Sequence, residues 1–232
     1  FFFFFNDTAT TEIYTGEDSF PTRRSSDLLA FQALGSMSRG TLKTMMEHVG
    51  HGVQVRRGGK IETVPAGSLQ RTIEFAGKPR TVVAIGWGDV STAYHSTGIA
   101  DITVSMAMPP AQLRGLKVLN MLAPLLRSKT VIRLLQAIVG RTVHGPDEKT
   151  RDAARADLWG KVTGLDGSSV EGRLGTPEGY KTTVITALAC VKRLLGDGAE
   201  PGYQTPSSAF GAGLVRTLPG FSLEVGAVRT AG

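Results

Sequence analysis

Cysteine is nearly absent from this chain, whose 232 residues include one, Cys190. A single cysteine excludes an internal disulfide framework and a zinc site built from several cysteines, and it is typical of a protein of the reducing cytoplasm. The chain also lacks an uncharged apolar run of about 18 residues, so the sequence predicts no membrane-spanning helix. Its 41% apolar and 20% charged residues exclude a disordered tail and a membrane bundle and favour a folded cytoplasmic protein.

Motifs that bind nucleotides or metals are missing too. There is no G-x-G-x-x-G fingerprint and no P-loop, and the glycine pairs in residues 86–88 and 211–213 lack a third glycine, so turns and helix packing account for them. His48 and His51 have the spacing of a ligand pair, but no cysteine or further histidine nearby completes a set, and no metal site is predicted. Cys190 has apolar neighbours in a predicted helix, which favours a buried, inert thiol over a nucleophile.

Acidic residues are missing from residues 102–146, which contain six basic ones among many Leu and Ile residues. Such a basic amphipathic stretch could lie on an anionic membrane through residues 110–141, or line an acyl tunnel. We favour a simpler interpretation, a helix pair that covers the sheet with its bases in solvent at the rim. Nucleic acid is not an expected partner, because no recognised motif is present and aromatic side chains do not alternate with the bases.

The first 28 residues do not read as the start of a protein. They have neither the basic region before an apolar block nor the small-residue cleavage site of a signal peptide. Residues 6–15 and 19–28 are instead the codon-by-codon translation of two adjoining parts of a DNA sequencing adapter. We therefore expect residues 1–28 to be artefactual and disordered, and the true N-terminus to be missing. The remaining 204 residues carry 24 basic and 15 acidic side chains.

Strands and helices are intermixed along residues 29–232. The hydrophobic periodicity and turn residues predict helices over residues 36–49, 90–96, 109–139 with a break at Pro124, 178–195 and 206–218. They predict strands over residues 53–56, 61–64, 71–75, 81–85, 101–108, 153–163, 168–174 and 221–228. Regular strand–helix–strand alternation is absent, so the sequence favours an α+β domain with a mixed sheet and covering helices.

The helix predicted over residues 178–195 carries one apolar stripe. Its members recur at helical spacing. They are Tyr180, Val184, Leu188, Val191 and Leu195.

The densest group of reactive side chains lies in residues 86–98, which read GWGDVSTAYHSTG. This segment follows a predicted buried strand and opens a short helix. Asp89 is the expected N-cap of that helix, where its carboxylate would accept from backbone N–H groups of the first turn. Gly98 is the expected end of the helix.

The same segment suggests a substrate site. Together with Asp89, the hydroxyls of Ser91, Thr92 and Thr97 are the candidate substrate-binding groups, because hydroxyls and free N–H groups at a helix start can hold an anion or a carbonyl. Tyr94 and His95 are the candidate catalytic proton donors, because their side chains can transfer a proton. The alternative is a capped helix with a satisfied polar face.

Three stretches, in this order, resemble the saccharopine dehydrogenase-like oxidoreductases, a family that includes trans-acting enoyl reductases of lipid synthesis. They are residues 38–41 (SRGT) with Met45, residues 85–99 (IGWGDVSTAYHSTGI), and residues 202–211 (GYQTPSSAFG). Residues 85–87 depart from the Ile-Pro-Trp of many relatives. Residues 26–28 (SDL) stand where the family commonly has the end of a G-F-D-S-x-P-S-D-L motif.

The resemblance implies the C-terminal substrate and association part of a two-domain Rossmann-type oxidoreductase, whose N-terminal nucleotide-binding domain is missing. It implies hydride transfer from NAD(P)H to a small-molecule or acyl substrate, for example by an enoyl reductase of lipid metabolism. The substrate domain would cover residues 29–199, and residues 200–232 would return toward the missing domain. The fragment alone would bind no NAD(P) and be inactive, and a homodimer is one possible assembly.

A hypothesis of a different class is that the chain is a non-catalytic, peripheral lipid- or membrane-associated binding protein that uses residues 110–141.

If a partner domain is missing, the chain should also expose an apolar face, mainly from residues 200–228 and the start of the helix over residues 36–49.

Overall fold

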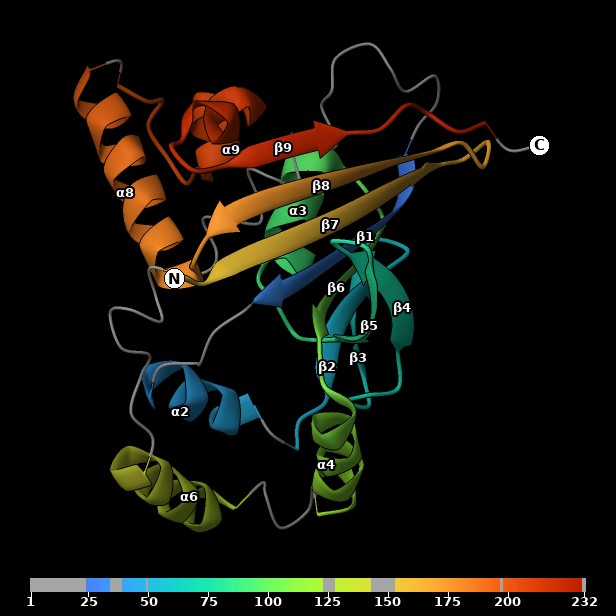
Figure 1. Cartoon of the computed structure of the whole chain (residues 1–232), viewed down its shortest axis with the longest axis vertical. Coiled ribbons are helices and arrows are strands. Elements are labelled where there is room, and N and C mark those ends of the chain that lie inside the picture. The colour runs from blue at the N-terminus through green and yellow to red at the C-terminus, as the bar shows by residue number, and fades with distance from the viewer. Residues whose placement is uncertain are drawn as a thin grey trace.

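Among the described residues, nine strands form one mixed sheet at the centre of the molecule (Figure 1). The structure is a computed structural model, and it describes residues 24–33, 39–48, 50–122, 128–142, 153–196 and 198–230. The strands are β1 (Arg24–Ala33), β2 (Val53–Arg57), β3 (Lys60–Val64), β4 (Gln70–Phe75), β5 (Lys78–Ala84), β6 (Asp101–Ala107), β7 (Arg155–Gly164), β8 (Ser169–Pro177) and β9 (Ser222–Val225). The helices are α2 (Arg39–His48), α3 (Asp89–Thr97), α4 (Pro110–Met121), α6 (Lys129–Thr142), α8 (Gly179–Gly196), α9 (Pro206–Phe210) and the 3₁₀ helix η1 (Ala212–Thr217).

The sheet is mixed because one pair of neighbouring strands is parallel. The main order is β3-β2-β6-β1-β7-β8-β9, and β1 runs parallel to β6 while the other described pairs are antiparallel. The second edge of β6 is shared: β2 pairs near its start and β5 near its end, and β4 pairs with β5. This arrangement confirms the predicted α+β class with a mixed sheet.

Apolar side chains pack on both faces of the sheet. Successive side chains of a strand point to opposite faces, so one strand can contribute to both. On one face Leu29 and Phe31 of β1 pack with Val90 of α3 and Val215 of η1. On the other face Ala30 packs with Trp159 of β7 and with the β4–β5 hairpin. β1 therefore contributes to two cores.

The expected boundary at residue 28 does not coincide with a boundary of the fold. β1 begins at Arg24, and Asp27 pairs with Ile102 of β6 on one side and Val162 of β7 on the other. Asp27 is only 2% exposed. The expectation of disorder is therefore wrong for residues 24–28, because these residues pair with strands on both sides; residues 1–23 lie outside the described residues.

Most predicted elements lie within a few residues of the observed ones. The prediction of one continuous helix over residues 206–218 was wrong. The segment is divided at Gly211 into α9 and η1. Gly211 has φ 78° and ψ 161°, a conformation that cannot continue a helix. The predicted break at Pro124 lies outside the described residues.

The expected exposure of an apolar face by residues 200–228 is seen only at single positions, since Tyr203 is 85% and Val225 37% exposed. Residues 36–38, at the start of the other expected segment, lie outside the described residues. Leu214, Val215 and Leu218 are at most 7% exposed, because they pack into the chain's own core. The apolar stripe of α8 faces outward instead, with Val184 58% and Leu188 55% exposed.

No helix in the described part of the chain is long and apolar enough to cross a membrane. In the same residues, no group of three or more His, Cys, Asp or Glu side chains could hold a metal ion.

Candidate functional site

The α3 helix begins differently from the prediction. Gly88, with helical φ −62° and ψ −27°, is its N-cap, and no side chain caps the helix. The N–H groups of Ser91 and Thr92 donate to the Gly88 carbonyl at 2.8 and 3.0 Å. Asp89 is therefore the first helical residue rather than the cap, and it is 1% exposed. The preceding Trp87 packs on Phe31, with ring centroids 5.3 Å apart, and so ties the helix start to the core.

The end of α3 agrees with the prediction. Gly98 has φ 70°, a left-handed conformation that glycine adopts readily, and its N–H donates to the Tyr94 carbonyl at 2.9 Å. The helix therefore ends at Gly98, as the sequence predicted.

Three hydroxyls of α3 donate to carbonyls of the preceding turn. Thr92 Oγ1 donates to the Gly88 carbonyl at 3.4 Å, and Ser96 Oγ to the Thr92 carbonyl at 3.0 Å. Thr97 Oγ1 donates to the Ala93 carbonyl at 2.5 Å and accepts from the N–H of Ile99. These bonds support the alternative of a satisfied polar helix for Thr92 and Thr97, since such bonds occupy the hydroxyl donors.

The candidate residues do not converge on one side of α3. Asp89 faces the core. Tyr94 and Thr97 are half-buried at the side of the helix, whereas Ser91 and His95 are exposed and one turn apart. Only Ser91 and His95 therefore present an open surface together. Their neighbour Tyr94 is adjacent, since its ring lies edge-on to His95 with centroids 5.6 Å apart.

Arg56 of β2 is a central residue that the sequence analysis did not single out. It is only 6% exposed, and its Nε donates to the Val90 carbonyl of α3 at 2.8 Å. One terminal nitrogen donates to the Gly59 carbonyl at 2.6 Å, and the guanidinium lies 4.2 Å from the centre of the Tyr94 ring. Arg56 thereby holds α3 against the β2–β3 turn. The β2 pattern gave no signal for this, because an arginine beside a turn is normally exposed.

The start of α3 does not offer a pyrophosphate site. A pyrophosphate site needs free N–H groups at a helix start, but those of Val90, Ser91 and Thr92 already donate to the carbonyls of Trp87 and Gly88. The buried side chain of Asp89 also occupies this first turn. In addition, the parallel strands β1 and β6 are separated by four other strands in the sequence rather than by one crossover helix.

Cys190 is buried in α8, as the sequence predicted. Burial raises the pKa of its thiol, and the charge of Arg193 offsets part of that rise. A raised pKa leaves less thiolate at a given pH, so the thiol is a weak nucleophile.

Alkylation tests this property. We expect iodoacetamide at mildly alkaline pH to modify Cys190 much more slowly in the folded chain than in urea, as followed by mass spectrometry, because burial limits both access and ionisation. Equal rates in the two states would contradict a buried, inert thiol.

Comparison with known proteins shows a likeness of fold. No protein-family model and no curated protein matches the chain. Among solved structures, the chain is similar to apo histidine-tagged saccharopine dehydrogenase (L-Glu forming) from Saccharomyces cerevisiae, with a TM-score of 0.53 and 10% identity. The match covers 94% of this chain and 70% of that chain. At this identity it supports a distant relationship of fold, which agrees with the family that the sequence stretches resemble.

Proposed function

We propose that this chain is the substrate-binding and association part of an NAD(P)-dependent oxidoreductase of the saccharopine dehydrogenase kind. The proposed reaction is hydride transfer between NAD(P)H and a small-molecule or acyl substrate, such as the enoyl group of a lipid intermediate. A preceding domain would hold the cofactor, so the chain alone would be inactive. The fold likeness to a dehydrogenase over 94% of the chain is the observation that supports this proposal.

The exposed side of α3 is the proposed contact with substrate. His95 and Ser91 are both open to solvent and one turn apart, so one small molecule could reach both. The Tyr94 ring is packed beside Arg56 and Gly59, which favours a structural contribution. We therefore propose His95 as the proton donor and Ser91 as a hydrogen-bonding group.

The test uses a protein extended by the upstream coding region of its gene. We expect the extended protein to bind NAD(P)H and to oxidise it in the presence of an enoyl thioester, or of an amino acid together with an aldehyde or 2-oxo acid with which its amine forms an imine, measured by nicotinamide absorbance. His95→Ala should lower kcat about 100-fold or more if His95 protonates the substrate. The matched control is Ser96→Ala, an exposed neighbour on the same helix, which should keep near-normal turnover.

Two outcomes would overturn the proposal. One is an upstream region that encodes no nucleotide-binding domain, and the other is an extended protein that binds no NAD(P)H. Normal turnover in His95→Ala combined with a large loss in Tyr94→Phe would assign the proton transfer to Tyr94 instead.

A further inference from the structure

Exposed apolar and basic side chains occur on both α4 and α6, and together they are named the α4–α6 patch. We propose that this α4–α6 patch docks on the surface of an anionic phospholipid bilayer. The inference goes beyond the proposed function and uses none of the α3 residues. The patch consists of Val118, Met121, Leu134, Ile138, Arg114 and Arg133.

The apolar members of the patch are unusually open for their type. Met121 is 78% exposed and Val118 53% exposed on α4, while Leu134 is 63% and Ile138 50% exposed on α6. On each helix the two residues are three or four positions apart, so they share one side. A helix in contact with water alone would carry polar residues at these positions.

The outer side of α6 is distinct from the side that packs on the protein. Ile132 and Leu135 are half-buried, and Gln136 donates to the Lys43 carbonyl of α2 at 3.2 Å. Leu134 and Ile138 are exposed on the side of α6 away from this contact, and Arg133, one residue before Leu134, is exposed as well. The helix therefore has one face for α2 and a second apolar face with an adjacent base.

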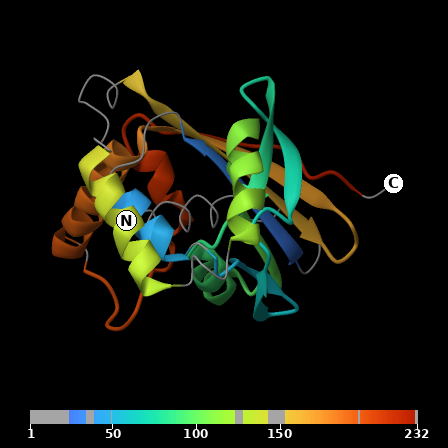
Figure 2. The same ribbon diagram turned by 90° about the horizontal axis from the view of Figure 1, so that it is seen from below.

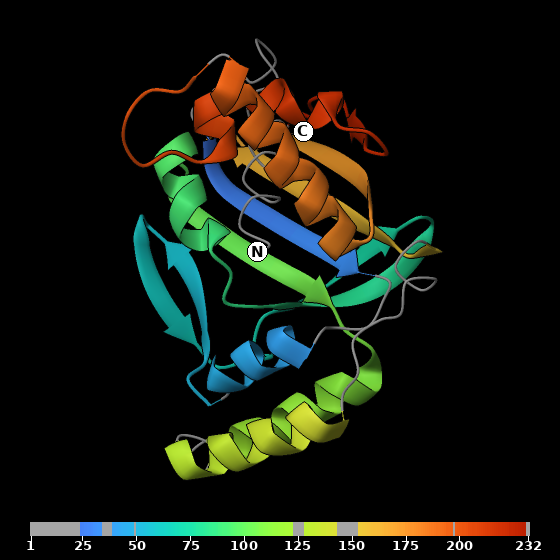
Figure 3. The same cartoon turned by 90° about the vertical axis from the view of Figure 1, so that its left-hand side faces the viewer.

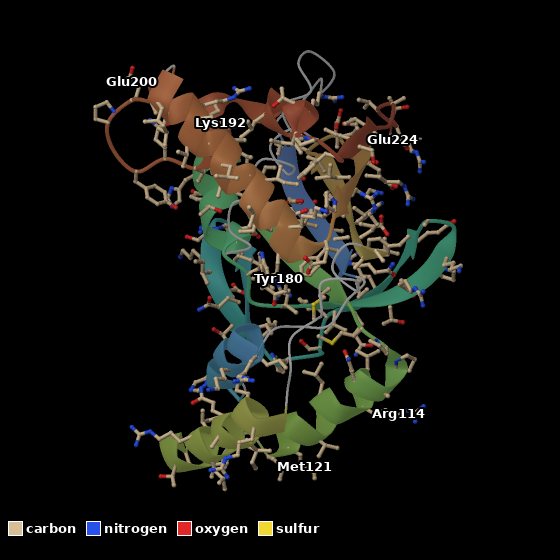
Figure 4. All side chains as sticks on the ribbon, turned by 60° about the vertical axis from the view of Figure 1, so that its left-hand side comes forward. Arg114, Met121, Tyr180, Lys192, Glu200 and Glu224 are labelled. Atoms are coloured by element: carbon tan, nitrogen blue, oxygen red, sulfur yellow. The ribbon has the colours of Figure 1, made fainter. Side chains whose placement is uncertain are left out.

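The two helices lie at the same end of the molecule. They lie below the sheet in Figure 1, and both are turned toward the viewer in Figure 2, which looks from that end. Figure 3 shows them along the same edge from the side. In Figure 4, Arg114 and Met121 lie at this end and Glu200 and Glu224 at the opposite one.

Charge favours an anionic lipid surface as the occupant. Residues 102–146, which include both helices, contain six basic residues and no acidic one. Exposed arginines beside apolar side chains are the combination that interfacial helices use, with the bases at lipid phosphates and the apolar groups at the headgroup–acyl boundary. A second copy of the chain would instead bring like charges together.

Co-sedimentation with vesicles tests the proposal. We expect the full chain to bind vesicles of phosphatidylcholine with one part in three of phosphatidylserine, and to bind pure phosphatidylcholine far more weakly. Leu134→Ser with Ile138→Ser should weaken binding about tenfold or more, because two inserting side chains are lost. The matched control is Val184→Ser with Leu188→Ser on α8, an apolar pair of the same spacing and similar exposure, which should leave binding unchanged.

A second double variant, with one change on each helix, tests whether the basic side chains contribute to vesicle binding. Arg114→Gln with Arg133→Gln should weaken binding to the anionic vesicles about tenfold and reduce its dependence on salt. Circular dichroism melting confirms that the variants remain folded.

A local probe reports which surface meets the lipid. A solvent-sensitive dye attached at Met121→Cys, in a Cys190→Ala background, should shift to shorter wavelength when anionic vesicles are added. The same dye at Leu165→Cys should not respond, because that exposed residue lies in the turn between β7 and β8.

Three results would overturn the proposal. They are no binding to anionic vesicles at low salt, equal loss of binding in the α6 and α8 double variants, and a dye response at residue 165 but not at residue 121. Self-association that depends on Leu134 and Ile138, without vesicle binding, would assign the patch to a second copy instead.

Discussion

A chain that begins at Leu29 is expected to lose cooperative folding, whereas one that begins at Arg24 is expected to keep it. Residues 26–28 pair with both β6 and β7, so their removal leaves parts of two strands unpaired in the centre of the sheet. Each lost backbone hydrogen bond lowers the free energy of unfolding by about 1 kcal/mol. Ile102 and Val162 are at most 1% exposed, and removal of the residue between them would also expose these apolar side chains to water. Several such losses are comparable to the total stability of a domain, about 5–15 kcal/mol.

Urea unfolding, followed by circular dichroism and tryptophan fluorescence, measures this difference. Trp159 is a suitable reporter because it lies opposite Ala30 of β1. The chain that begins at Arg24 is the control, since it retains all of β1. Equal unfolding midpoints for the two chains would contradict the pairing of β1 between β6 and β7.

Replacing Arg56 by Met is expected to destabilise the protein by about 2–4 kcal/mol, from two charged hydrogen bonds and a partly desolvated cation–π contact, less the cost of burying the charge. The bonds reach Val90 and Gly59, and the contact is with Tyr94. Arg56→Lys should lose most of the same stability, because an ammonium cannot reproduce the planar fork of a guanidinium. The free energy of urea unfolding measures both effects.

Arg57 provides a matched control one residue along the chain. Its guanidinium lies 3.7 Å from Glu62, and both side chains are half-exposed. Arg57→Met should therefore change stability by no more than about 0.5–1 kcal/mol. Equal losses in the Arg56 and Arg57 variants would show that the buried contacts of Arg56 do not hold α3 in place.

The parts of the fold that could be predicted depend on local interactions. The hairpin of β2 and β3 pairs Val53 with Val64 and closes at Arg57 and Lys60, as its alternating residues and turn predicted. The turn between β7 and β8 is likewise local, since Asp166 accepts from the N–H of Ser168 at 2.9 Å. In both cases residues close in sequence decide the conformation.

The candidate site was only partly predictable. The helix in residues 86–98 and its end at Gly98 follow from residue types, and the structure agrees. The start of the helix and its anchoring do not, because they depend on Trp87 against Phe31 and on Arg56 beneath α3. These partners come from strands far away in the sequence, so no local pattern reports them.

The α8 helix separates what the sequence by itself determined from what only the tertiary structure decided. The periodicity of its apolar residues determined a helix, because spacing alone places them on one side. Which side became buried was decided by packing on the sheet and η1: the threonine side faces inward, and the apolar stripe faces out. The buried threonine hydroxyls do not remain unpaired, because Thr182, Thr183 and Thr186 donate to backbone carbonyls nearby.

The same distinction holds for β1. Its apolar run from Leu28 to Phe31 is compatible with a buried strand, but its place between β6 and β7 depends on partners far along the sequence, such as Ile102 and Val162. Local sequence determines the conformation of a segment through short-range sterics and turn geometry. Its neighbours, and hence its buried face, are decided only when the whole sheet assembles and excludes water from one common core.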